Sequence, residues 1–357
     1  MSAILHSPVA APHATTSNST TRVMATVMLA LAPATLYGFW LYGWPAIYLW
    51  LVTVGFAVFG EAFCLRLMGR QATPVLLDGS AVLTGWLLAI SLPPWAPWWI
   101  GAFGGLFATV LAKQVFGGLG QNLFNPAMVA RVALLISFPV QMTAWVAPLP
   151  LFSPGAPGAI DGLAILLKGL PPALDAVSSA TTLGFAKTEL SRGVDLLASL
   201  PHAPALSWQG QRPGSLGETA AWLIAAGGVA MIFLRIISWH IPLAMLAGIA
   251  LPAAIANAVD PAHYLGATAH VLSGGAMLGA FFIATDYVTS PNTARGQLLF
   301  GAGCGLLTWV IRTFAGYPEG VAFAVLLMNS LTPIIDTYIK PRIYGRDRKG
   351  VPLEPVK

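Results

Sequence analysis

Gly101-Ala102-Phe103-Gly104-Gly105-Leu106 lies within a long apolar run, and Gly301-Ala302-Gly303-Cys304-Gly305-Leu306 repeats its G-A-x-x-G-L pattern 200 residues later. Small residues four positions apart let a neighbouring helix approach closely, so each copy alone is typical of a helix-packing face. Both copies fall in the fourth apolar run of their half of the chain. This recurrence predicts that the fold arose by an internal duplication.

The composition around these motifs is that of a membrane protein. The chain has 357 residues, of which 56% are apolar and 9% charged, with a mean hydropathy of +0.73. Soluble domains carry roughly 25% charged residues, so we predict a polytopic protein embedded in a lipid bilayer. The net charge of +5 comes from basic residues between apolar runs and in the tail, which indicates orientation in the membrane rather than nucleic-acid binding.

The apolar runs predict ten membrane-spanning helices in two groups of five. They cover residues 23–42, 46–68, 79–92, 98–116, 126–146, 219–237, 241–259, 268–285, 297–315 and 320–339. Because five is odd, the second group enters the membrane from the opposite side, which gives an inverted repeat. The predicted organisation is a disordered N-terminal tail (1–21), a first five-helix repeat (22–146), a long loop (147–218), a second repeat (219–339) and a basic tail (340–357).

The basic tail sets the predicted orientation. It holds Lys340, Arg342, Arg346, Arg348 and Lys349. Basic segments stay on the cytoplasmic side, and an even number of spans then places both termini there. We therefore expect a multi-pass protein of the bacterial cytoplasmic (inner) membrane, with the loop of residues 147–218 on the extracytoplasmic side. That loop is too long for a plain connection, which makes it a functional candidate.

The loop contains the polar stretch Asp175-Ala176-Val177-Ser178-Ser179-Ala180-Thr181. An ordinary polar turn would read the same way, so the stretch alone is a weak signal. It resembles the flavinylation motif, Asp-x-x-Ser-x-Ala-Thr, of the family that includes the D-type membrane protein of the Rnf ion-translocating electron-transport complex. A related member is the B-type protein of the sodium-translocating NADH:quinone reductase. Further stretches similar to this family are residues 117–122, 124–129, 134–139, 273–286, 316–318 and 320–329.

The resemblance implies that Thr181 is joined through a phosphoester to FMN, which a separate flavin transferase installs from FAD. Asp175, Ser178 and Ala180 would form the recognition motif, and Thr182 is the rival hydroxyl one position further on. It also implies a membrane subunit of an ion-translocating oxidoreductase, relaying electrons between other subunits while the complex moves Na⁺ or H⁺. No turnover is expected from this chain alone. The competing class is a small-solute channel or transporter, since an inverted repeat serves either.

Two further residues are candidates for a second, non-covalent flavin or an ion path. Asn125, preceded by the glycine-rich segment 117–121 and followed by Pro126, is placed to cap a helix and could cradle an anion there. A tight interhelical turn explains the same residues equally well. Asp286 closes the eighth apolar run, although the family usually shows Asp-Pro where this chain has Asp286-Tyr287.

Charged residues inside apolar runs are the remaining candidates. Glu61 and Arg131 lie within the second and fifth runs, where an ionisable group is costly and suggests a function. An ion path, a mutual salt bridge and contact with a partner subunit are all compatible with them. His270 is expected to be a packing residue. Cys64 and Cys304 lie far apart, without a CxxC pair, which argues against a zinc or iron–sulfur site within the chain.

Overall fold

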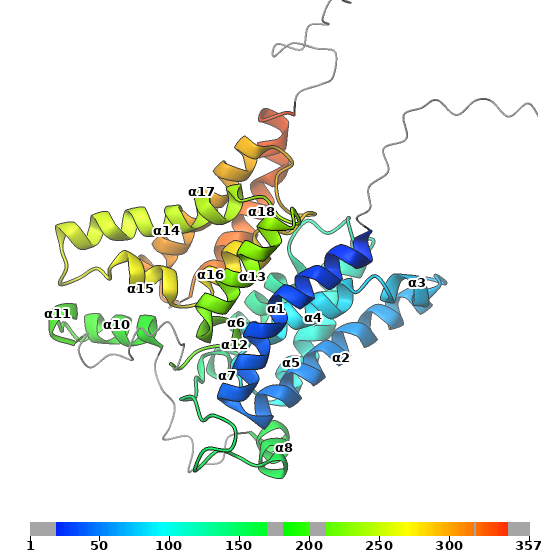
Figure 1. Ribbon diagram of the computed structural model, residues 1–357, viewed down its shortest axis with the longest axis horizontal. Coiled ribbons are helices and arrows are strands. Elements are labelled where there is room, and N and C mark those ends of the chain that lie inside the picture. Colours follow the sequence, from blue (N-terminus) through cyan, green and yellow to red (C-terminus); the bar gives the residue numbers. More distant parts are fainter. Residues whose placement is uncertain (1–18, 170–180, 200–211, 318, 342–357) are drawn as a thin grey trace, which may run out of the picture.

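The computed structural model describes residues 19–169, 181–199, 212–317 and 319–341. These residues form α-helices and short π-helical turns, without a β-strand among them. Figure 1 shows most helices of the N-terminal half on one side and most of those of the C-terminal half on the other, with α1 running beside α13 at the boundary. The described part of this charge-poor, apolar chain is therefore helical, as expected.

The first helical group runs from α1 to α7. Its elements are α1 (Thr20–Tyr42), α2 (Trp44–Leu67), α3 (Ala72–Leu76), α4 (Ser80–Ser91), α5 (Trp98–Leu106), η1 (Phe107–Gln114), α6 (Pro126–Ser137) and α7 (Pro139–Thr143). The run predicted as one helix over 126–146 is broken, since α6 ends at Ser137 and a new turn starts at Pro139. A proline there cannot donate its backbone nitrogen to the preceding turn. The predicted helix over 98–116 ends in the π-helical turn η1.

The second helical group runs from α12 to α18. Its elements are α12 (Leu216–Thr219), α13 (Ala221–Phe233), α14 (His240–Val259), α15 (Ala267–Leu272), α16 (Ala276–Leu278), η3 (Gly279–Ile283), α17 (Ala294–Phe314) and α18 (Val321–Tyr338). The run predicted as one helix over 268–285 is interrupted at Ser273-Gly274-Gly275, where Gly274 has a φ of +62°. Only glycine adopts that backbone conformation without steric cost. The eighth apolar run is thus two short helical pieces.

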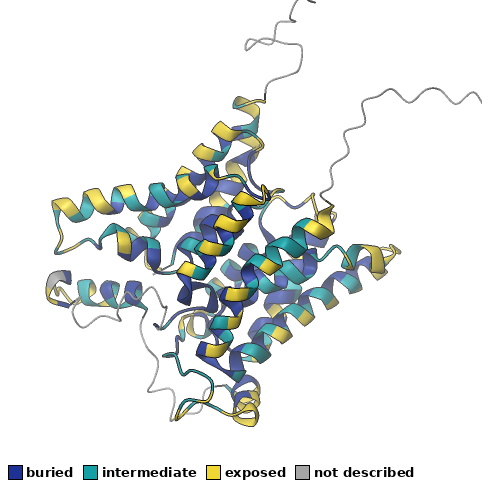
Figure 2. Cartoon of the chain, in the orientation of Figure 1, coloured by how far each residue is buried: buried dark blue, intermediate teal, exposed yellow. Residues whose placement is uncertain are grey.

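Within the described residues, five helices are long and apolar enough to cross a membrane: α1, α2, α14, α17 and α18. Shorter apolar helices, α4, α6 and α13, lie among them. Many large apolar side chains of the long helices point outwards, including Leu29 (72% exposed) and Leu251 (63%). Figure 2 shows such exposed positions along the outer faces, with buried residues between the two groups. This distribution is that of a multi-pass membrane protein whose outer surface meets lipid.

Both glycine motifs are packing faces, as predicted. A Cβ atom on Gly105 would lie 2.6 Å from the carbonyl oxygen of Thr53 in α2. One on Gly305 would lie 2.9 Å from the Cα of Gly248 in α14. In each group, therefore, the helix that carries the motif (α5 or α17) lies backbone-to-backbone against the helix of the second predicted span (α2 or α14). Equivalent motifs make equivalent contacts.

The described part of the long loop contains three helices, α8 (Ala159–Lys168), α10 (Thr182–Ser191) and α11 (Leu196–Ser199). The first of them packs on α2 of the first group, and the other two dock onto the second group. Leu183 and Ala186 of α10 pack with Leu196 against Leu265 and Ala269, which lie at the α14–α15 connection. The segment that begins at Thr181 is therefore a helix held on the protein body.

Candidate functional site

Thr181 is the N-cap residue of α10. Its backbone is extended (φ −65°, ψ 157°), and its Oγ1 accepts a hydrogen bond from the Gly184 amide at 3.1 Å. The side chain is half-buried, whereas the rival Thr182 is only 3% exposed. A hydroxyl in this position caps the helix and stays within reach of solvent. The motif residues Asp175, Ser178 and Ala180 lie outside the described residues.

Lys187 fastens α10 to the end of α17. Its Nζ donates hydrogen bonds to the carbonyl oxygens of Ala315 and Tyr317, the latter at 2.7 Å. Burial lowers the pKa of the Lys187 ammonium from its ordinary value. Carbonyl groups at a helix C-terminus carry partial negative charge and lack intrahelical donors, so a lysine is well suited to bind them. The helix that starts at Thr181 is thus attached by a charge-assisted contact as well as by apolar packing.

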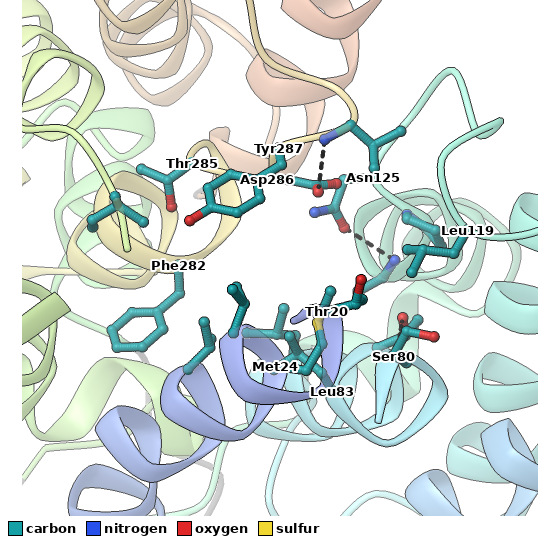
Figure 3. Close-up of a pocket in the computed structure, with 18 of the residues that line it drawn as sticks. Thr20, Met24, Ser80, Leu83, Leu119, Asn125, Phe282, Thr285, Asp286 and Tyr287 are labelled. Atoms are coloured by element: carbon teal, nitrogen blue, oxygen red, sulfur yellow. Dashed lines mark hydrogen bonds between the residues drawn. The ribbon is translucent and has the colours of Figure 1, made fainter. Parts of the chain in front are cut away.

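A cavity of about 280 Å³ lies between the two helical groups. Apolar side chains of α1, α4, α13 and η3 line most of it, and Ser80, Lys113, Asn125 and Asp286 contribute polar atoms. Figure 3 shows Asn125 and Asp286 on neighbouring walls, with Thr20 and Met24 of α1 below them. The volume is close to the lower end of small-molecule sites, about 300–1,000 Å³. Two of the predicted site residues, one from each helical group, therefore meet at one cavity.

Both of these residues also organise the local backbone. The Asn125 side chain caps α6 by accepting from the amides of Ala127 (3.1 Å) and Met128 (3.3 Å). The backbone amide of Asn125 donates to Oδ1 of Asn329 in α18 at 3.2 Å, and this hydrogen bond joins the two groups. The carboxylate of Asp286 accepts from the Val288 amide at 3.3 Å and from the Thr289 hydroxyl at 3.2 Å. Asp286 thus shapes its own turn although tyrosine follows it.

Glu61 lies behind the cavity wall and is fully buried. Its carboxylate is 2.7 Å from Lys113 Nζ and accepts from Gln114 Nε2 at 2.6 Å. Lys113 also donates to the Ser80 hydroxyl at 2.7 Å, and Ser80 opens α4. The alternative of a salt bridge between Glu61 and Arg131 is therefore wrong. Its partner is Lys113, which is itself buried.

Arg131 belongs to a different group of charges, which we name the inter-group cluster. Its members are Arg131, Arg212, Glu218, Arg312 and Glu319. Arg131 donates to the Ser91 carbonyl oxygen at the end of α4 and to the Glu319 carboxylate, and its Nη2 lies 3.9 Å from Glu218. All five side chains are largely buried. Glu218, Glu319 and Arg212 were not singled out from the sequence.

The inter-group cluster caps the break in the eighth apolar run. Arg312 donates to the carbonyl oxygens of His270 (2.5 Å) and Ser273 (3.1 Å), and Arg212 donates to that of Leu272. On the other side of the break, the Glu319 carboxylate accepts from the Gly275 amide at 2.5 Å. Cations thus meet the C-terminal end of α15 and an anion meets the start of α16, as helix dipoles favour. His270 is buried, in keeping with its predicted packing role.

These features place the chain in the class of multi-pass membrane proteins. Its described residues are helical, and two helical groups enclose a small cavity and a buried charge cluster. The family model described as the NQR2, RnfD, RnfE family matches residues 8–345. The chain therefore belongs to this family, and the resemblance predicted from its motifs is confirmed.

Similar curated proteins cover nearly the whole chain. A protein of Halorhodospira halophila is 54% identical over 347 residues, which are 97% of each chain. One of Stutzerimonas stutzeri is 54% identical, covering 95% of this chain and 96% of its own. One of Escherichia coli strain SMS-3-5 is 43% identical, covering 95% and 98%. All three are named as the D-type subunit of an ion-translocating oxidoreductase complex.

Proposed function

We propose that this chain is the D-type membrane subunit of an ion-translocating oxidoreductase complex and that it carries FMN on Thr181. The first part rests on similarity, at 54% identity along 97% of the chain, to a protein with that name. The second rests on one observation. The half-buried Thr181 caps the N-terminus of α10 with its hydroxyl, while the neighbouring Thr182 is buried. Its partners would be the other subunits of the complex, together with the flavin transferase that modifies Thr181.

The residues at Thr181 suit a phosphoester. The amides of the first turn of α10 point towards its N-terminus, where a phosphate oxygen would gain from hydrogen bonds and from the helix dipole. The bridging ester oxygen would keep a lone pair for the Gly184 amide, so the helix cap need not be lost. Bound FMN would supply the electron-carrier chemistry, and the chain supplies its position.

The membrane arrangement we propose is two inverted repeats of five spans each. Five long apolar helices and the shorter α4, α6 and α13 support it. So do the matching contacts of Gly105 with α2 and Gly305 with α14. The basic tail would be cytoplasmic, and the loop with Thr181 extracytoplasmic, in the bacterial inner membrane.

The cavity lined by Asn125 and Asp286 is our proposed place for a second, non-covalent flavin or for part of the Na⁺ or H⁺ path. Its apolar walls with a few polar groups suit a flavin ring. Glu61 would act through Lys113, whose side chain reaches the cavity. A channel or transporter could use the same fold, so the flavin content decides between the two classes.

The test uses the protein expressed with its flavin transferase and separated on a denaturing gel under ultraviolet light. We expect a fluorescent band that disappears in Thr181→Val and persists in the matched control Thr182→Val. Flavin released into the supernatant on acid precipitation measures the non-covalent fraction in the same sample. A dark wild-type band would remove the covalent flavin, and fluorescence surviving Thr181→Val would place the attachment elsewhere.

A further inference from the structure

The described residues between α17 and α18 (315–317 and 319–320, named here the α17–α18 loop) contact two functional regions at once. Lys187 of α10 donates to the carbonyl oxygens of Ala315 and Tyr317. Two residues beyond Tyr317, the Glu319 carboxylate binds Arg131 of α6. The α17–α18 loop is therefore bound at one end by α10 and at the other by the salt bridge between the two helical groups.

The Arg131–Glu319 pair lies at the far end of the interior from the cavity. Ser80 at the start of α4 lines the cavity, and Ser91 at its end accepts from Arg131, about 16 Å further along the helix axis. The segment from Gly275 to Asp286 spans the same interval, since Gly275 donates to Glu319 and Asp286 lines the cavity. The pair therefore joins the two groups at the end of α4 opposite the cavity.

This junction is a largely buried ion pair. The Arg131 and Glu319 side chains are 10% and 16% exposed, so their attraction is only weakly screened. Separating them would leave a largely buried charge without its partner, which is costly. A shift of the α17–α18 loop would move Glu319 relative to Arg131 and so weaken or strengthen this contact between the two groups. Lys187 is the polar contact that ties α10 to this loop.

We propose that Lys187 is a positioning residue that couples α10, the helix carrying the flavin, to the Arg131–Glu319 pair. A change in the position of α10 is transmitted through the α17–α18 loop to the contact that joins the two groups. Removing the Lys187 ammonium leaves the redox group attached but disconnects it from that contact. This inference rests on the proposed function of Thr181 and of the complex.

The test uses the complete complex in proteoliposomes, with Lys187→Met in this chain. Electron transfer, ion uptake and in-gel flavin fluorescence are measured on the same preparation. We expect the fluorescent band and electron transfer to persist, while the number of ions moved per electron falls well below the wild-type ratio measured in the same way. Lys187→Arg should retain the ratio because it keeps the cation. Lys168→Met, an exposed lysine of α8, is the matched control.

An unchanged ion-to-electron ratio in Lys187→Met overturns the proposal, whatever happens to the electron-transfer rate. If that variant fails to assemble, Glu319→Gln replaces it at the other end of the same loop, and an unchanged ratio there overturns the proposal equally. A similar fall in the number of ions moved per electron in Lys168→Met would also overturn it, because the effect would not be specific to the contact that Lys187 makes. A dark wild-type band, in contrast, rejects the flavin on Thr181, so the two failures are distinguishable.

Discussion

Replacing Glu61 tests the buried charges behind the cavity. In Glu61→Leu the Lys113 ammonium stays 2% exposed and retains the Ser80 hydroxyl at 2.7 Å, but it loses the carboxylate at 2.7 Å. Removing one partner of a buried pair costs about 3–5 kcal/mol, because the remaining charge has no compensation. Lys113→Met should cost a similar amount, since Glu61 then keeps only Gln114.

The double variant Glu61→Leu/Lys113→Met removes both charges. Only the neutral groups of Gln114 and Ser80 then lose hydrogen bonds, at about 1–3 kcal/mol for an unsatisfied buried group. The single losses then sum to about 8 kcal/mol at mid-range against about 4 kcal/mol for the double variant, a difference of about 4 kcal/mol. The free energy of unfolding is measured by titrating the micelle-bound protein with SDS and following tryptophan fluorescence.

The exposed pair Arg192–Glu189 provides the control. Arg192 is 67% exposed in its side chain, so Arg192→Met should change stability by less than about 1 kcal/mol. The reasoning that the pair is desolvated would be refuted by two results together. Glu61→Leu and Lys113→Met would each lower the free energy of unfolding by less than about 1 kcal/mol, and the loss in the double variant would equal their sum. If the double variant folds and assembles but the complex moves no ions, Glu61 acts in the ion path and not only in stability.

Two further substitutions probe the fold. Gly105→Ala should destabilise the protein by about 1–3 kcal/mol, because its Cβ would lie 2.6 Å from the Thr53 carbonyl oxygen. Gly55→Ala, with no atom within 4 Å of its Cβ, should be neutral or slightly stabilising in the same SDS titration. Equal effects at the two glycines would contradict the close contact of α5 with α2. Asn125→Ala should cost about 1–2 kcal/mol by removing the α6 cap, and Asn125→Asp, which can still accept from both amides, should recover most of it. No recovery in that thermal or SDS measurement would mean that the cap is not what Asn125 contributes.

The sequence predicted the features that depend on local pattern. Apolar runs of membrane length became α1, α2, α14, α17 and α18 within a residue or a few of the expected bounds. Small residues at a spacing of four predicted the packing faces around Gly105 and Gly305. Asn125 before Pro126 predicted the start of α6, because both residue types favour a helix N-terminus.

The features that were missed depend on distant partners. Glu61 and Lys113 are 52 residues apart, and Arg131 and Glu319 are 188 apart, so no local pattern could pair them. Lys113 was not singled out from the sequence, because nothing nearby in the chain indicates the buried carboxylate of Glu61 that it contacts. The break at Ser273-Gly274-Gly275 was hidden because its apolar neighbours keep the average hydropathy of the run high.

Thr181 shows the same division. Its motif predicted the attachment position, which the structure leaves as a proposal. The motif did not predict that Thr181 caps a docked helix, because that arrangement depends on apolar contacts between α10 and the distant residues Leu265 and Ala269. The part of the loop from Thr181 to Ser199 is docked on the second group for this reason.

The break in the eighth apolar run also has a consequence for biogenesis. Backbone groups opened by Gly274 have no water to bind within a bilayer, and they are satisfied by Arg312 and Glu319. Both residues are synthesised after the break, on α17 and just before α18. The segment from α15 to η3 therefore cannot reach its final conformation when it first enters the membrane. It has to wait for the last helical pair, which makes insertion of the C-terminal hairpin the step that completes the interior of the protein.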